Sequence, residues 1–91
     1  MINIKDYPEF EFLMLGIMDN YSDFSDGINS FIKLISEKEQ TALKNEILRL
    51  KKYETWEIQT FMARNHLGRP KQKEIPVMLK TILEVLENNM V

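Results

Sequence analysis

The chain has 91 residues, with 14 Asp and Glu against 12 Lys and Arg, so it is long enough for one hydrophobic core and carries a net charge of −2. Apolar residues make up 44% of it and charged residues 29%, with three Gly and three Pro, which excludes the disordered and fibrous classes. The absence of Cys excludes disulfides, thiol nucleophiles and zinc–thiolate sites. The longest apolar run, Phe12 to Met18, is too short to cross a bilayer, and the N-terminus shows no export signal. We therefore expect a single cytoplasmic domain over residues 1–91.

The first half of the sequence predicts two helices. Asp6 is a candidate N-cap and Pro8 suits a first helical turn, so a first helix is expected from there to about Asp19. Residues 20–27 are rich in short polar side chains and predict a turn that holds at most one helical turn. A second helix is expected from Asp26 to Ile35.

The second half predicts three more helices. Ser36 has a Glu three residues later and opens a third helix through a capping box. Thr55 is expected to cap a fourth helix, and Gly68 stands where that helix needs a left-handed C-terminal cap. Residues 67–74 predict a basic loop, and Pro76 stands in the first turn of a fifth helix.

The apolar residues of all these segments recur at steps of three and four, as one buried helical face requires. No segment alternates with period two. The prediction is therefore an all-α fold, a single compact domain of about five short helices. The predicted core consists of Phe10, Leu13, Ile17, Ile28, Phe31, Leu43, Ile47, Leu50, Phe61, Leu79, Ile82 and Leu86.

Few residues suggest catalysis or metal binding. His66 is the one histidine, and its sequence neighbours supply no carboxylate partner, which favours a structural role near a helix C-terminus over a small hydrolase or nuclease that uses it. A calcium loop aligned on Gly27 would place Phe24 and Lys33 at ligand positions, which excludes that site. We expect no enzymatic activity, no metal and no cofactor.

Two features of the second half leave alternatives open. Gly68-Arg69-Pro70-Lys71 is similar to the core of a minor-groove AT-hook, although a helix stop and a solvated loop explain the same residues. The alternative function is thus a small helical nucleic-acid-binding regulator that uses the basic 64–73 segment, with Arg64, Arg69, Lys71 and Lys73. The six Met suggest either an adaptable groove or core filler, and their spacing favours core filler.

Charge is divided unevenly along the chain. Residues 1–32 carry six acidic side chains against one basic, whereas residues 33–73 carry ten basic against five acidic. An acidic end steers a small domain toward a basic partner, although an uneven solvated surface gives the same pattern.

The order of the segments resembles the small helical immunity proteins of bacterial contact-dependent growth inhibition systems. Three groups of residues carry the resemblance: Tyr7-Pro8-Glu9-Phe10 with Phe12-Leu13, an acidic and aromatic turn (Asp19, Tyr21, Asp23, Phe24), and Gly27-Ile28 before Phe31-Ile32. The sequence departs from the family pattern at Gly27, where alanine is usual, and at Tyr21 and Phe24, which replace a tryptophan.

The resemblance implies a non-catalytic cytoplasmic immunity protein that binds the C-terminal toxin domain of a cognate effector and blocks it in a 1:1 complex, without direct contact to nucleic acid or membrane. Many such toxins are nucleases, whose substrate faces are basic because they grip phosphates. From the charge distribution we expect carboxylates to stand in for phosphate; Asp23 and Asp26 are alternatively helix caps. The expected toxin-facing residues are Asp19, Tyr21, Asp23 and Asp26, with Glu9 and Glu11 as outer contributors.

Overall fold

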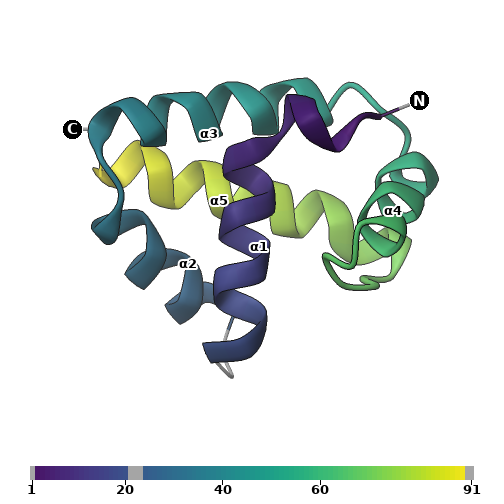
Figure 1. The fold of residues 1–91 in the computed structure, drawn as a ribbon, viewed down its shortest axis with the longest axis horizontal. Helices are drawn as coiled ribbons and strands as arrows, with labels where there is room; N and C mark the ends of the chain where they lie inside the picture. Colours follow the sequence, from purple (N-terminus) through teal and green to yellow (C-terminus); the bar gives the residue numbers. More distant parts are fainter. Residues whose placement is uncertain (1, 21–23, 90–91) are drawn as a thin grey trace.

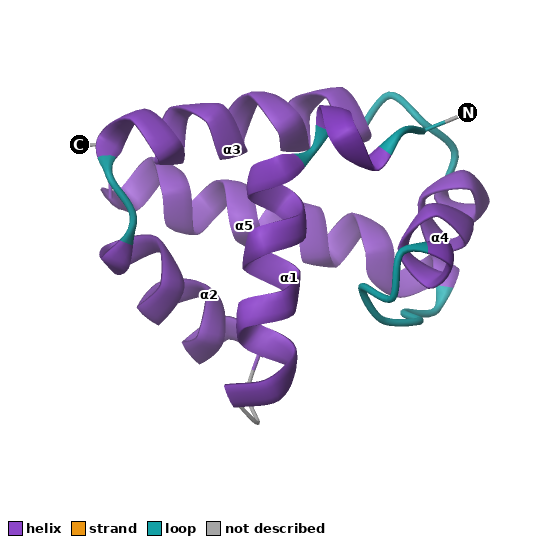
Figure 2. Ribbon diagram, viewed as in Figure 1, coloured by secondary structure: helices purple, strands orange, loops and turns teal. Residues whose placement is uncertain are grey.

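Helices make up most of the part of the chain that the computed structural model describes, residues 2–20 and 24–89, with the side chains of 18–20 excepted (Figure 1). No strand occurs within these ranges, so the all-α prediction is confirmed (Figure 2). The radius of gyration is 12.1 Å, close to the value of about 12 Å expected for one globular domain of this length. The elements are η1 (Ile4–Asp6), α1 (Pro8–Asn20), α2 (Phe24–Leu34), α3 (Glu37–Leu50), α4 (Thr55–Arg64), η2 (Gln72–Glu74) and α5 (Ile75–Asn89).

The helices are arranged around α5. In Figure 1, α1 crosses in front of α5, α3 runs along one side of both, and α2 and α4 lie at opposite ends. α5 packs against α2, α3, α4 and η2, whereas α1 packs against α2, α3 and η1. No described helix lies in front of α1 in this view, so one face of α1 is left uncovered.

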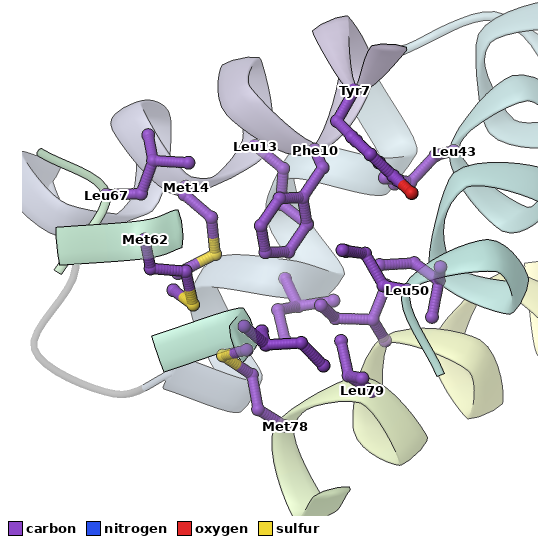
Figure 3. Packing of buried hydrophobic residues seen from close by; sticks show 14 of the residues in the cluster. Tyr7, Phe10, Leu13, Met14, Leu43, Leu50, Met62, Leu67, Met78 and Leu79 are labelled. Carbon is purple, nitrogen blue, oxygen red and sulfur yellow. The ribbon is translucent and has the colours of Figure 1, made fainter. Parts of the chain in front are cut away.

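The predicted core is confirmed except at one residue. Phe10, Leu13, Leu43, Leu50 and Leu79 converge between α1, α3 and α5 (Figure 3). The exception is Phe31, which is only partly buried. Its ring packs beside the exposed ring of Phe12 in α1, with the two ring centroids 5.4 Å apart. Leu67 begins the predicted basic loop and Ile75 directly follows it, yet both residues are fully buried.

The start of α1 differs from the prediction, because its cap comes from another helix. Asp6 lies in η1 and does not cap α1. Instead, the buried carboxylate of Glu46 in α3 accepts hydrogen bonds from the backbone N–H of Glu9 (3.2 Å) and of Phe10 (2.9 Å). A negative charge at a helix N-terminus compensates the unpaired amides and the helix dipole. α3 therefore fixes the position of α1.

The end of α2 is held by α3 in the complementary way. The buried side-chain amide of Gln40 donates hydrogen bonds to the carbonyl oxygens of Ile32 (3.0 Å) and Ile35 (3.3 Å), which lack helical partners. α2 itself begins at Phe24, two residues before the predicted start, and Phe24 packs against the core. Burial of Phe24 accounts for the longer helix.

The caps of α3 and α4 test the local predictions. Ser36 and Glu39 form the predicted capping box, with N–H to side-chain oxygen distances of 3.2 and 3.0 Å. The prediction that Thr55 caps α4 was wrong. The N-cap is Glu54, whose backbone N–H donates to the Glu57 carboxylate at 3.1 Å. The Thr55 hydroxyl instead donates to Gln72 Oε1 at 3.2 Å and ties α4 to η2.

The C-terminus of α4 also corrects the prediction, because the left-handed cap is His66 and not Gly68. The φ angle of His66 is 59°. Its N–H donates to the carbonyl of Ala63 (3.3 Å), and the N–H of Leu67 donates to the carbonyl of Met62 (2.8 Å). These two bonds define a Schellman motif, and the buried pair Leu67 and Met62 supplies its apolar contact.

Candidate functional site

The structure describes only part of the predicted acidic site. Asp26 is exposed in the first turn of α2, and Glu9 and Glu11 are half-buried in α1. The side chain of Asp19, and the whole of Tyr21 and Asp23, lie outside the described residues.

Glu9 and Glu11 do not lie together. Two residues apart on a helix correspond to about 200° of rotation, which places them on opposite sides of α1. The pKa of Glu9 is raised by partial burial and by the charge of Glu39 in α3. Glu9 therefore belongs to the edge that α1 shares with α3, and Glu11 to the opposite edge.

An exposed apolar surface lies beside Glu11. We call it the α1–α2 patch, defined as Phe12, Leu15, Phe31 and Leu34. Phe12 is 63% exposed, Leu15 48% and Leu34 81%. The ring centroids of Phe12 and Phe31 lie 5.4 Å apart and link the two helices. Leu15 follows Phe12 by three residues and Leu34 follows Phe31 by three, so each pair shares a helical face.

Gly16 allows this contact between the helices. A Cβ placed on Gly16 would lie 3.4 Å from two ring carbons of Phe31. An alanine Cβ would reach van der Waals contact with the ring, whereas a residue larger than alanine at 16 would push the Phe31 ring away from α1. The aromatic pair is thus held in place by the packing of α1 on α2.

The charges of α1 and α2 are mainly negative. α1 contains Glu9, Glu11 and Asp19 and no Lys or Arg, and α2 contains Asp26 and Lys33. Glu11 lies one turn before Leu15 on the same face of α1. Exposed apolar side chains bordered by charges are typical of protein–protein contact sites.

Sequence reasoning missed the α1–α2 patch, although a signal for it was present. Among the side chains of α1 that the structure describes, the buried ones are Phe10, Leu13, Met14 and Ile17, and Phe12 and Leu15 do not fall on their helical period. Large apolar residues outside the buried stripe of an amphipathic helix are the pattern that identifies such a surface.

A second apolar surface lies on a different face of α1, that of Met14. A groove of about 730 Å³ is lined by Met14, Met62 and Met78, with Arg69 and Lys73 also in its wall. Figure 3 shows Met14 and Met62 near Leu67, with Met78 further along beside α5. All three methionines are at least nine-tenths buried, so the prediction that they fill the core is confirmed for them. The same side chains also form part of the wall of the groove.

The basic segment is spread over several elements. Arg64 and Arg69 line a shallow depression of about 570 Å³ with Gln59, and Lys71 and Lys73 are exposed around η2. His66 is exposed at the end of α4. Among the residues described, no three His, Asp or Glu side chains lie close enough to hold a metal ion. None of the described helices has the length and hydrophobicity needed to span a bilayer.

Comparison with known proteins identifies no relative of this chain: no family model, curated protein or solved structure matches it. The evidence for its function therefore lies in its own residues.

Proposed function

We propose that this chain is an immunity protein that binds the C-terminal toxin domain of a cognate contact-dependent growth inhibition effector in a 1:1 cytoplasmic complex and blocks it. The resemblance of the first 32 residues supports this family. The observation that carries the proposal is the exposed α1–α2 patch, because it lies in the acidic part of the chain and suits contact with a basic protein.

Charge complementarity gives the proposed mechanism. A nuclease toxin carries cations where it grips phosphates, and Glu11 and Asp26 present carboxylates from α1 and α2. Apolar contact at the centre of such an interface excludes water and strengthens the surrounding charge pairs. The immunity protein then occupies the substrate face of the toxin and needs no catalytic group of its own.

The position of His66 supports a binding protein over an enzyme. The histidine is exposed, and its backbone serves the Schellman motif that ends α4. If the proposal holds, His66→Ala retains toxin protection, whereas a hydrolase dependent on this residue would lose most of its rate.

An immunity gene normally follows its effector, so the test uses the C-terminal domain of the protein encoded immediately upstream of this gene, purified as an inactive variant for binding. The parent chain is expected to bind it 1:1 in titration calorimetry and to protect cells that express the active toxin. Charge reversal of Asp19 and Asp23 together to Lys is expected to weaken binding per folded molecule, and thermal melting is the control because Asp23 is alternatively a helix cap. If that double variant stays folded and binds as tightly as the parent, Asp19 and Asp23 do not replace phosphate.

A second candidate function rests on Arg64 and Arg69, which line one depression. In that case the isolated protein would retain duplex DNA or RNA with steep salt dependence, and Arg69→Ala would reduce the retention. Failure of the parent to bind the toxin together with such retention would favour the nucleic-acid-binding regulator.

A further inference from the structure

We infer that the α1–α2 patch is the anchor of a protein interface and that its occupant is an arginine-bearing basic surface of the partner. This inference rests on the proposed function, and it specifies which residues of the chain supply most of the binding energy. It assigns that role to Phe12 and its neighbours, which lie beside Glu11 in α1.

The Phe12 ring is exposed and is also held in position by α2. Phe12 is 63% exposed, yet its ring packs against the ring of Phe31, with 5.4 Å between the two ring centroids. Both aromatics project from helices, and the absence of a side chain at Gly16 leaves room for Phe31. An aromatic side chain already held in position loses little conformational entropy on binding, which is typical of residues that dominate interface energetics.

The groups around the ring suit a partner that carries arginines. The guanidinium of Arg stacks on aromatic faces and pairs with carboxylates, and here an exposed aromatic ring and the Glu11 carboxylate come from consecutive residues of α1. A basic partner surface can therefore place arginines on the ring and at the carboxylate. Within this chain Arg49 shows the same type of contact, since its guanidinium lies 5.0 Å from the Tyr7 ring centroid.

A second copy of the chain is a poorer occupant of this surface. A symmetric dimer would bring the Glu11 carboxylates of both copies into the same contact. Like charges across an interface oppose association. The charge of the patch surroundings thus favours a cationic partner over self-association.

The experiment compares two exposed aromatic residues. Phe12→Ala is expected to weaken binding to the inactive upstream toxin domain roughly 30-fold, mainly through faster dissociation, as loss of an interface anchor does. Phe12→Tyr, which keeps a ring, is expected to retain most of the affinity. Trp56→Ala is the matched control, because Trp56 is 57% exposed on α4, away from α1 and α2; it is expected to change the affinity less than about threefold. Thermal melting of each variant shows that it is folded.

The outcomes separate this inference from the proposed function. If the parent binds the toxin domain and Phe12→Ala binds it equally well, the anchor is elsewhere and only this inference is overturned. If the parent does not bind the toxin domain, the proposed function and the inference are both overturned. Light scattering that shows a parent dimer and a Phe12→Ala monomer would identify a second copy as the occupant and would also overturn the inference.

Discussion

The buried carboxylate of Glu46 offers a sharp test of how α1 is held. It is 3% exposed and accepts hydrogen bonds from two backbone amides at the start of α1, those of Glu9 and Phe10. Glu46→Ala removes both acceptors and leaves the buried Phe10 N–H without its partner. Glu46→Gln keeps one acceptor oxygen and removes the charge.

The expected magnitudes follow from these contacts. Hydrogen bonds to a charged acceptor contribute about 1.5–3 kcal/mol each, and burial of the carboxylate offsets part of that. We expect Glu46→Ala to lower the free energy of unfolding by about 2–4 kcal/mol. Glu46→Gln is expected to lower it by less than about 1 kcal/mol, because it retains a bond while relieving the burial of charge. Urea denaturation at pH 7 measures both.

The pH dependence of the same variants gives a second readout. Burial raises the pKa of Glu46 more than the hydrogen bonds from Phe10 and Glu9 lower it. The pKa of Glu46 is therefore higher in the folded state than in the unfolded state, where a Glu side chain has a pKa of about 4.3. Protonation of Glu46 thus stabilises the folded state, fully below the unfolded-state pKa, and this stabilisation is lost as the pH rises through the folded-state pKa. The stability of the parent relative to Glu46→Gln should thus increase as pH falls from 7 to 4.

The control is a surface glutamate, Glu84, whose ion pair with Lys80 spans 3.9 Å between exposed side chains. Glu84→Ala should lower stability by less than about 0.5 kcal/mol. If Glu46→Ala is no more destabilising than this control, the two hydrogen bonds do not hold α1. A stability difference between the parent and Glu46→Gln that decreases on acidification would refute the raised pKa.

Three further stability predictions can be checked by urea or thermal unfolding. His66→Gly should raise the free energy of unfolding by about 0.5–1 kcal/mol because glycine adopts a φ of 59° without strain, and a decrease would contradict this account of the cap. Ile47→Ala should lower it by about 2–5 kcal/mol because Ile47 is fully buried, and a cost near zero would contradict that burial. Gly16→Ala should raise the melting temperature slightly, since alanine favours the helix and its Cβ would reach ordinary contact with Phe31; a drop would show that the ring does not yield.

The parts of the fold that were predictable depend on local sequence. Helical periodicity identified the buried residues, and the capping box at Ser36 involves residues only three apart. The cap of α1 involves Glu46, which is 36 residues away from Phe10 and has no local signature. His66 at the end of α4 was missed because Gly68, two residues later, is the residue that such a cap prefers.

The candidate site was less predictable for a similar reason. Charge counts identified the acidic part of the chain but not the directions of its side chains. The placement of Glu9 and Glu11 on opposite sides of α1 follows from helical rotation once the helix is assigned. The contact of Phe12 with Phe31 depends on how α2 packs against α1 at Gly16, which is tertiary information.

The residues that carry the family resemblance divide into two groups in the structure. Tyr7 and Phe10 are buried, and the centroids of their rings lie 5.6 and 6.3 Å from that of the Phe61 ring. Ile28 is fully buried as well. These residues belong to the core on which the helices pack, so their presence in related chains would preserve the fold whatever the partner. Phe12 is exposed, so a change there alters mainly the surface and its contact with Phe31. Under the proposed function, selectivity among toxins should therefore follow the exposed residues of α1 and α2, and exchanging those residues between this chain and an immunity protein for another toxin should exchange their partners while leaving both chains folded.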